Sequence, residues 1–151
     1  MPAADIRALF VYGTLMRASG HPMAMRLGSQ SLYLGPGRIA ARLYNLGSYP
    51  GAVPSDKARD SVQGDVVKLL RPASTLAWLD KYEGCGAGAP EPQAYQRVIA
   101  PVVLSAGESL NAWVYFYKMP VHRARHISHG CYLASRAMRV QQRICPLMSS
   151  E

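Results

Sequence analysis

The sequence predicts a single α+β domain in which a small, curled antiparallel or mixed sheet carries a few helices. Three observations favour this class. Short strand-like segments punctuated by glycine and proline recur along residues 8–117, one clear helix interrupts them after residue 71, and helical spacing returns near the C-terminus. Strands and helices in this order pack as separate layers, whereas a doubly wound sheet alternates them regularly.

The length is that of one domain. The chain has 151 residues, of which 49% are hydrophobic and 17% are charged, which suits one hydrophobic core. We expect a single domain over residues 1–151, with a core from about residue 7 to residue 131 and a basic, helical C-terminal extension from about residue 120 to residue 151. The spacing of Leu133, Ala137, Val140 and Ile144 predicts that helix.

The first half of the chain contains mostly expected strands. These are Ala8–Tyr12, Ser31–Leu34, Arg38–Tyr44 and residues 61–70, with room for one short helix or a loop at residues 17–28. Gly35-Pro36-Gly37 punctuates the second and third strands. Residues 47–54 carry two glycines and two prolines and are expected to form a loop.

The clearest helix covers Pro72 to Glu83. Proline is favoured in the first turn of a helix and glycine just after its last, and Gly84 stands in that place. Two more strands are expected over residues 94–104 and 110–118. Pro101 either breaks the first of these or confines it to an edge.

Glu83 is the most informative residue of this helix. It lies seven residues after Leu76 and four after Leu79, so it shares their apolar face. Partial burial, the helix C-terminus and the like charge of Asp80 would each raise its pKa, which suits a general acid/base. Alternatively, Glu83 turns to solvent at a fraying helix end or pairs with Arg97.

The net charge is +8 and is concentrated near the C-terminus. Residues 112–151 hold six lysines and arginines and one acidic residue. A basic surface suits an acidic partner, but the segment has little aromatic interleaving and no recognition motif, so nucleic acid is not the expected partner. The apolar runs are far below the roughly 20 residues that span a bilayer, so no membrane partner is expected.

Three cysteines, Cys85, Cys131 and Cys145, have no metal-ligand spacing. We interpret them as free thiols of a cytoplasmic protein, because disulfides are rare in that compartment. The N-terminus carries Asp5 and Arg7 and has no long apolar segment of the kind found in a signal peptide.

Three stretches carry a resemblance to a known family. They are FVYGTLM at residues 10–16, LDKYEGC at residues 79–85 and YQRVIAPV at residues 95–102. Together they resemble the γ-glutamylcyclotransferase-like superfamily, and especially the small bacterial branch of its AIG2-like proteins. The resemblance extends from about Leu9 to Pro120 and leaves the basic C-terminal segment largely outside.

The resemblance implies a small, mixed, barrel-like sheet flanked by helices, with a cavity between the first loop and the end of the Pro72–Glu83 helix. It implies that Glu83 is the catalytic acid/base and that the backbone of Tyr12, Gly13, Thr14 and Leu15 binds substrate. The implied reaction releases 5-oxoproline from a small γ-glutamyl amine or amino acid and needs no cofactor. A non-catalytic small-molecule-binding or regulatory protein of the same fold is the alternative.

Two other groups of residues could belong to a functional site. Trp113, Tyr115 and Tyr117 alternate along one expected strand and share a face. That face either lines the cavity, with Tyr117 as a further substrate-binding residue, or belongs to an aromatic core. His122, His126 and His129 have helical spacing, yet Gly130 argues against a regular helix and no ligand set is complete, so no metal site is expected.

Overall fold

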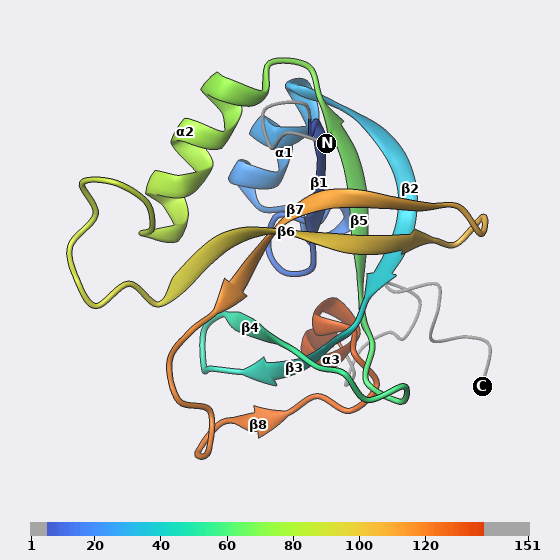
Figure 1. Cartoon of the computed structure of the whole chain (residues 1–151), viewed down its shortest axis with the longest axis vertical. Helices are drawn as coiled ribbons and strands as arrows, with labels where there is room; N and C mark the ends of the chain where they lie inside the picture. Colours follow the sequence, from blue (N-terminus) through green and yellow to red (C-terminus); the bar gives the residue numbers. More distant parts are fainter. Residues whose placement is uncertain (1–5, 138–151) are drawn as a thin grey trace.

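The computed structural model describes residues 6–137 and shows a closed barrel joined to a smaller sheet (Figure 1). The barrel order is β1-β5-β2-β6-β7, and the smaller sheet has the order β4-β3-β8. The strands are β1 (Ala8–Val11), β2 (Ser31–Ile39), β3 (Ala41–Asn45), β4 (Pro50–Pro54), β5 (Val62–Leu69), β6 (Tyr95–Leu104), β7 (Ser109–Tyr117) and β8 (Arg125–His126). The helices are the 3-10 helix η2 (Arg17–Ser19), α1 (Pro22–Ser29), α2 (Pro72–Glu83) and α3 (Tyr132–Ala137). The predicted α+β class with a mixed, barrel-like sheet is confirmed.

The first strand closes the barrel and makes the sheet mixed. β1 runs antiparallel to β5 and parallel to β7, where Leu9 lies opposite Trp113. β6 and β7 form a long antiparallel hairpin in which Tyr95 pairs with Tyr117. The end of β1 therefore lies among strands that are distant from it in the sequence, and the loop after Val11 starts at that junction.

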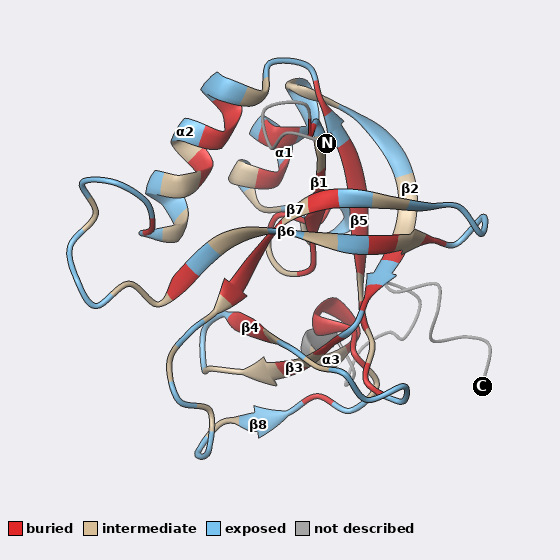
Figure 2. Ribbon diagram, viewed as in Figure 1, coloured by how far each residue is buried: buried red, intermediate tan, exposed pale blue. Residues whose placement is uncertain are grey.

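Helix α2 packs on the outside of the barrel with one apolar face. Thr75, Leu76 and Leu79 are buried, and Figure 2 shows the buried stripe of this helix on the side toward the strands. The helix ends as predicted, because Gly84 adopts the left-handed conformation at φ 69° and its N–H bonds the carbonyls of Asp80 and Lys81. Glu83 is thus the last residue of α2.

The predicted break at Gly35-Pro36-Gly37 is wrong. β2 runs continuously from Ser31 to Ile39 and absorbs the irregularity as a register shift between Tyr33 and Gly35. A bulge of this kind accommodates one extra residue while the strand continues. The ladder with β6 begins only at Gly37, and the Pro36 carbonyl accepts the N–H of Ser105, the residue after β6, at 2.9 Å.

The loop predicted over residues 47–54 contains a strand that the sequence analysis missed. β4 pairs antiparallel with β3 and is the outer strand of the smaller sheet. Proline is tolerated in such a position because an edge strand leaves one side of its backbone unpaired. The segment was predicted as a loop because Pro50 and Pro54, at its two ends, lower its intrinsic strand propensity.

The C-terminal extension differs from the helix expected from residue 120 onward. Residues 118–131 form turns and the two-residue β8, which pairs with β3 at Tyr44 and Asn45. A helix begins only at Tyr132, with Leu133 buried. Residues 138–151, which include Val140 and Ile144, lie outside the described residues.

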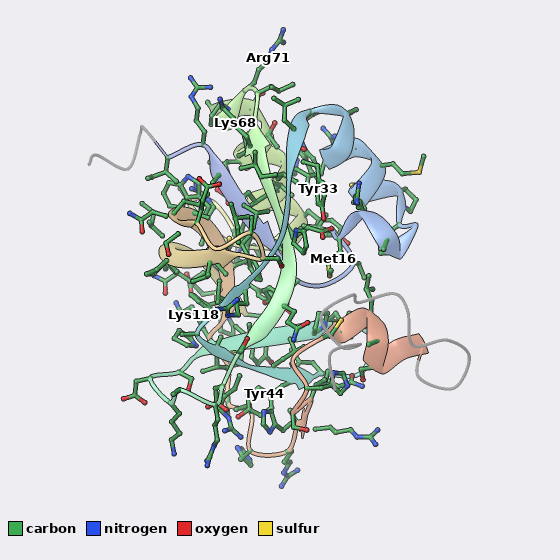
Figure 3. The ribbon with its side chains drawn as sticks, turned by 90° about the vertical axis from the view of Figure 1, so that its right-hand side faces the viewer. Met16, Tyr33, Tyr44, Lys68, Arg71 and Lys118 are labelled. Carbon is green, nitrogen blue, oxygen red and sulfur yellow. The ribbon has the colours of Figure 1, made fainter. Side chains whose placement is uncertain are left out.

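Two buried tyrosines join the barrel to the smaller sheet. The Tyr12 hydroxyl donates to the carbonyl of Tyr115 at 2.7 Å and accepts from the N–H of Ala52 at 3.1 Å. The Tyr95 hydroxyl donates to the carbonyl of Pro50 at 2.5 Å. One apolar core extends across both sheets, and the turned view in Figure 3 shows Arg71 and Tyr44 toward opposite ends of the molecule.

The prediction that the cysteines are free thiols is confirmed for one of them and wrong for another. Cys85 is a buried free thiol as predicted, whereas Cys131 is disulfide-bonded, so the prediction of a free thiol there is wrong. Cys145 lies outside the described residues. The cytoplasmic location stays a prediction. Within residues 6–137, no helix has the length and apolar character needed to cross a bilayer.

Replacing Tyr12 by phenylalanine should weaken the joint between the two sheets. The change leaves the Ala52 N–H and the Tyr115 carbonyl without their buried partner, so the free energy of unfolding should fall by about 1–3 kcal/mol. Urea denaturation measures the loss. The matched control is Tyr49→Phe, because residue Tyr49 is 45% exposed, and equal losses in both variants would contradict the assignment.

Candidate active site

A cavity of about 410 Å³ opens where the end of β1, the end of α2 and the start of β6 meet. It is lined by residues 10–15, 49–50, 82–83 and 94–95 together with Tyr115. This volume lies in the usual range for small-molecule pockets, roughly 300–1,000 Å³. The predicted Glu83 and the predicted Tyr12–Leu15 loop therefore share one cavity.

Glu83 reaches the cavity from the last turn of α2. Leu76 and Leu79 on the same face are buried against the barrel, and this packing brings the Glu83 side chain, itself half-buried, to the cavity wall. Neither alternative for this residue is seen. Glu83 does not turn away to bulk solvent, and Arg97 pairs with Asp80 instead.

The Glu83 carboxyl is raised in pKa by its surroundings. Burial raises its pKa from 4.5 to about 7, because a desolvated carboxylate is less stable than the neutral acid. Within residues 6–137, the carboxyl has no hydrogen bond or ion pair. Of the three effects expected from the sequence, burial is the one that causes this shift.

Asp80 explains why Glu83 has no cationic partner. Its carboxylate accepts two hydrogen bonds from Arg97, at 2.7 and 3.0 Å, and one from the Tyr115 hydroxyl at 2.6 Å. The Arg97 guanidinium also lies 4.3 Å from the centre of the Trp113 ring. These contacts attach the last turn of α2 to β6 and β7, and they keep the nearest guanidinium bound one turn before Glu83.

The Tyr12–Leu15 loop forms the opposite wall. Gly13 packs against Pro50 so closely that a Cβ built on it would lie 2.7 Å from the proline Cγ. Only glycine fits this approach without moving β4. The Thr14 hydroxyl lies 3.3 Å from that of Tyr82, the residue before Glu83. The two walls of the cavity therefore contact each other at its rim.

The residues of this loop that line the cavity have unpaired backbone donors. The Met16 N–H bonds the carbonyl of Gly13 at 3.0 Å and so closes a turn. Within the described part of the chain, the N–H groups of Gly13, Thr14 and Leu15 make no hydrogen bond. Neighbouring unpaired amides are suited to an anion.

The side chains of two residues predicted to bind substrate, Tyr12 and Tyr117, make contacts elsewhere. The Tyr12 phenol is committed to Tyr115 and Ala52, so any substrate contact of Tyr12 falls to its backbone. Tyr117 does not line this cavity; it stacks edge-on against Tyr95 at 5.4 Å and faces a separate hollow. The substrate contact of Tyr117 stays a prediction.

Of the three aromatic residues that share this face of the strand, Tyr115 is the one that lines the cavity. It lies on the same face of β7, and it lines the cavity while its hydroxyl donates to Asp80. Burial and this carboxylate raise the pKa of the phenol, so it remains a donor. Tyr49, Tyr82 and Tyr95 complete the aromatic lining. Tyr82 could have been predicted as a lining residue from the sequence, because it directly precedes Glu83. Tyr49 could not, because its place depends on strand β4, which the sequence did not predict.

The described side chains that line the cavity include an acidic group and no basic group. Among the described residues that line it, Glu83 is the only one with a charged side chain, and none is lysine, arginine or histidine. An anionic ligand group would therefore depend on neutral donors, which are the backbone N–H groups and the hydroxyls of the lining. Across residues 6–137, no three His, Cys, Asp or Glu side chains gather as a metal site requires.

A loop of eleven residues, 84–94, follows α2 and returns to the cavity at Ala94. The Gln93 side chain accepts from the Gly86 N–H at 3.0 Å and donates to the carbonyls of Gly86 and Ala89 at 3.0 and 3.3 Å. The Cys85 N–H bonds the Asp80 carbonyl at 2.9 Å. The loop is thus braced internally and anchored where it leaves the helix.

Comparison with known proteins gives a consistent family. The family described as "Gamma-glutamyl cyclotransferase, AIG2-like" matches residues 9–134. A "Gamma-glutamylcyclotransferase family protein ytfP" from Citrobacter rodentium is 33% identical over 126 residues, which cover 83% of this chain and 94% of that protein.

Solved structures share the fold. The Bacillus subtilis protein YkqA superposes with a TM-score of 0.65 at 23% identity; 88% of this chain is covered, but it spans only 42% of YkqA. An AIG2-like protein from Mus musculus superposes with a TM-score of 0.61 at 24% identity, over 78% of this chain and 81% of that one. At these identities the likeness concerns the fold alone.

The pKa of Glu83 predicts a pH-dependent stability difference. The folded state holds the Glu83 proton up to about pH 7 and the unfolded state only up to about 4.5, so the wild type loses stability as the pH rises through this window. Glu83→Gln cannot ionise. The melting temperature of Glu83→Gln, relative to that of the wild type at the same pH, should therefore rise between pH 5 and pH 8.

The measurement is thermal unfolding of both proteins at several pH values. The control is Glu108→Gln, in the exposed turn between β6 and β7. A Glu83→Gln difference that stays constant from pH 5 to pH 8, or that Glu108→Gln reproduces, would refute a buried titrating Glu83.

Proposed function

Because the chain belongs to the gamma-glutamyl cyclotransferase, AIG2-like family, we propose that it is a cofactor-independent cyclotransferase releasing 5-oxoproline from a small γ-glutamyl amine or amino acid. One observation carries the proposal. An unpaired carboxyl of raised pKa, Glu83, lines the same cavity as three unpaired N–H groups, those of Gly13, Thr14 and Leu15.

The proposed substrate carries both reacting groups. Its α-amino nitrogen attacks its own γ-carbonyl carbon, a five-membered lactam forms, and the bond from that carbonyl carbon to the leaving nitrogen breaks. The reaction is an intramolecular acyl transfer, and such reactions reach effective molarities of about 10⁵ M or more when the groups are well oriented. The main contribution of the protein is then to fold the substrate and to move protons.

Glu83 is the proposed carrier of these protons. Over the reaction the α-ammonium group loses two protons and the leaving nitrogen gains two. A carboxylate that accepts a proton from the first nitrogen and returns it to the second is regenerated at each transfer. A pKa of about 7 suits both directions near neutral pH, since proton transfer is efficient when the pKa lies close to the working pH.

The N–H groups of the Tyr12–Leu15 loop are the proposed anion site. They would hold either the substrate α-carboxylate or the oxygen that becomes negative when the γ-carbonyl is attacked. The absence of lysine, arginine and histidine from the described lining supports this division of roles. A cation beside Glu83 would lower its pKa and impair it as an acid/base.

The alternative is a binding protein with the same cavity and no reaction. It keeps the carboxylate site but does not need Glu83 to titrate. Incubating the purified protein with a panel of γ-glutamyl amines and γ-glutamyl amino acids, and assaying 5-oxoproline, separates the two. Saturable binding without release of 5-oxoproline by the wild type favours the alternative.

Glu83→Gln should lower kcat by about 10²- to 10⁴-fold, the usual contribution of a positioned acid/base. In the wild type, kcat/KM should fall as the pH drops below about 7, because the proposed first step needs the carboxylate. Steady-state release of 5-oxoproline from pH 5 to pH 9 tests both points. Glu108→Gln is the control, and an unchanged kcat in Glu83→Gln would end the proposal.

Gly13→Ala should lower kcat/KM, because the new methyl group displaces either Pro50 or the donor loop. The matched control is Gly28→Ala on α1, where an added Cβ meets nothing within 4 Å. We expect Gly28→Ala to retain activity and to match or exceed wild-type stability. Equal activity of the two variants would contradict the close packing at Gly13.

A further inference from the structure

The N–H groups of the Tyr12–Leu15 loop are oriented by hydrogen bonds that the carbonyl groups of the same loop accept. The Gly13 carbonyl accepts the Met16 N–H at 3.0 Å, and the Thr14 carbonyl accepts the Ser19 hydroxyl at 2.6 Å. In a planar trans peptide the C=O and N–H bonds point in opposite directions. Holding the Thr14 carbonyl toward Ser19 therefore directs the Leu15 N–H away from Ser19.

The hydrogen bonds of Ser19 have a single possible polarity. The His21 N–H lies 3.0 Å from the Ser19 oxygen and can only donate to it. The only hydroxyl proton of Ser19 is therefore available for the Thr14 carbonyl, which can only accept. Ser19 itself is half-buried and does not line the cavity, so any effect of its hydroxyl on a ligand must pass through the Thr14–Leu15 peptide.

The segment between Thr14 and Ser19 is also anchored to the barrel. The buried Asp65 of β5 accepts the Arg17 N–H at 2.9 Å. The Arg17 guanidinium lies 3.7 Å from the centre of the Tyr33 ring on β2, and Figure 3 shows Tyr33 above the loop that carries Met16. With its middle fixed to β5 and β2, this segment presents the Ser19 hydroxyl at a defined place.

We propose that Ser19 is a positioning residue that holds the Thr14–Leu15 peptide in the orientation in which its N–H binds a carboxylate or an oxyanion in the cavity. The identity of that ligand rests on the proposed function, whereas the orientation of the peptide does not. Without the hydroxyl, the peptide is free to rotate and to turn its carbonyl, a repulsive group for an anion, toward the ligand.

The test uses the full chain and three substitutions. Ser19→Ala removes the donor, and Ser19→Thr keeps it. Ser29→Ala is the matched control, because the Ser29 hydroxyl makes the same kind of bond, to the Arg26 carbonyl at 2.8 Å, on the exposed helix α1. If Ser19→Ala does not fold, Ser19→Cys replaces it, since a thiol has similar shape but is a weak donor.

The probes are acetate and 5-oxoproline, followed by ¹H–¹⁵N NMR of the loop amides and by calorimetry. In the wild type, the Leu15 amide signal should shift saturably with either probe. Ser19→Ala should raise the Kd for 5-oxoproline by about 10-fold or more, the effect of losing a hydrogen bond to a charged group. Ser19→Thr and Ser29→Ala should bind as the wild type does.

Three results would overturn the inference: no response of the Leu15 amide in the wild type, an unchanged Kd in Ser19→Ala, or an equal loss in Ser29→Ala. The proposed function fails separately. Ser19-dependent binding without any release of 5-oxoproline would refute the cyclotransferase and support the role of Ser19. Turnover that Ser19→Ala leaves unchanged in kcat/KM would do the reverse.

Discussion

The site depends on the donors of β6 and β7 that converge on the Asp80 carboxylate. Arg97 of β6 and Tyr115 of β7 bond it from the barrel, and this attachment fixes the last turn of α2 against the two strands. The same contacts engage the guanidinium that would otherwise be available to Glu83. A charged pair one turn away thus leaves the neighbouring carboxyl desolvated and unpaired, with a pKa of about 7.

Much of this arrangement could be predicted from local patterns. The apolar spacing of Leu76, Leu79 and Glu83 on a helix bounded by Pro72 and Gly84 placed the carboxyl on the inward face, and α2 has those bounds. The α+β class followed from the order of strands and helix. The pairing of FVYGTLM with the helix end came from the family resemblance, and the structure brings both segments to one cavity.

What could not be predicted depends on contacts between distant segments. Edge strand β4, bounded by Pro50 and Pro54, has the composition of a loop and is a strand only because β3 lies beside it. The choice between Tyr115 and Tyr117 depends on where the β7 face meets α2, since both alternate alike. The sequence could not decide which carboxylate pairs with Arg97. Asp80 and Glu83 lie within one helical turn, so their spacing favours neither of them.

The brace within residues 84–94 has a consequence for how such a scaffold diversifies. Glu83, the proposed acid/base, precedes this segment and is held by α2, and Gln93 ties the segment mainly to itself. Exchange or lengthening of its exposed middle would reshape the mouth of the cavity and leave the Glu83 carboxyl in place. Under the proposed function, chemistry and selectivity would then occupy separable parts of the chain, and one frame could serve different amines when a single surface segment is exchanged.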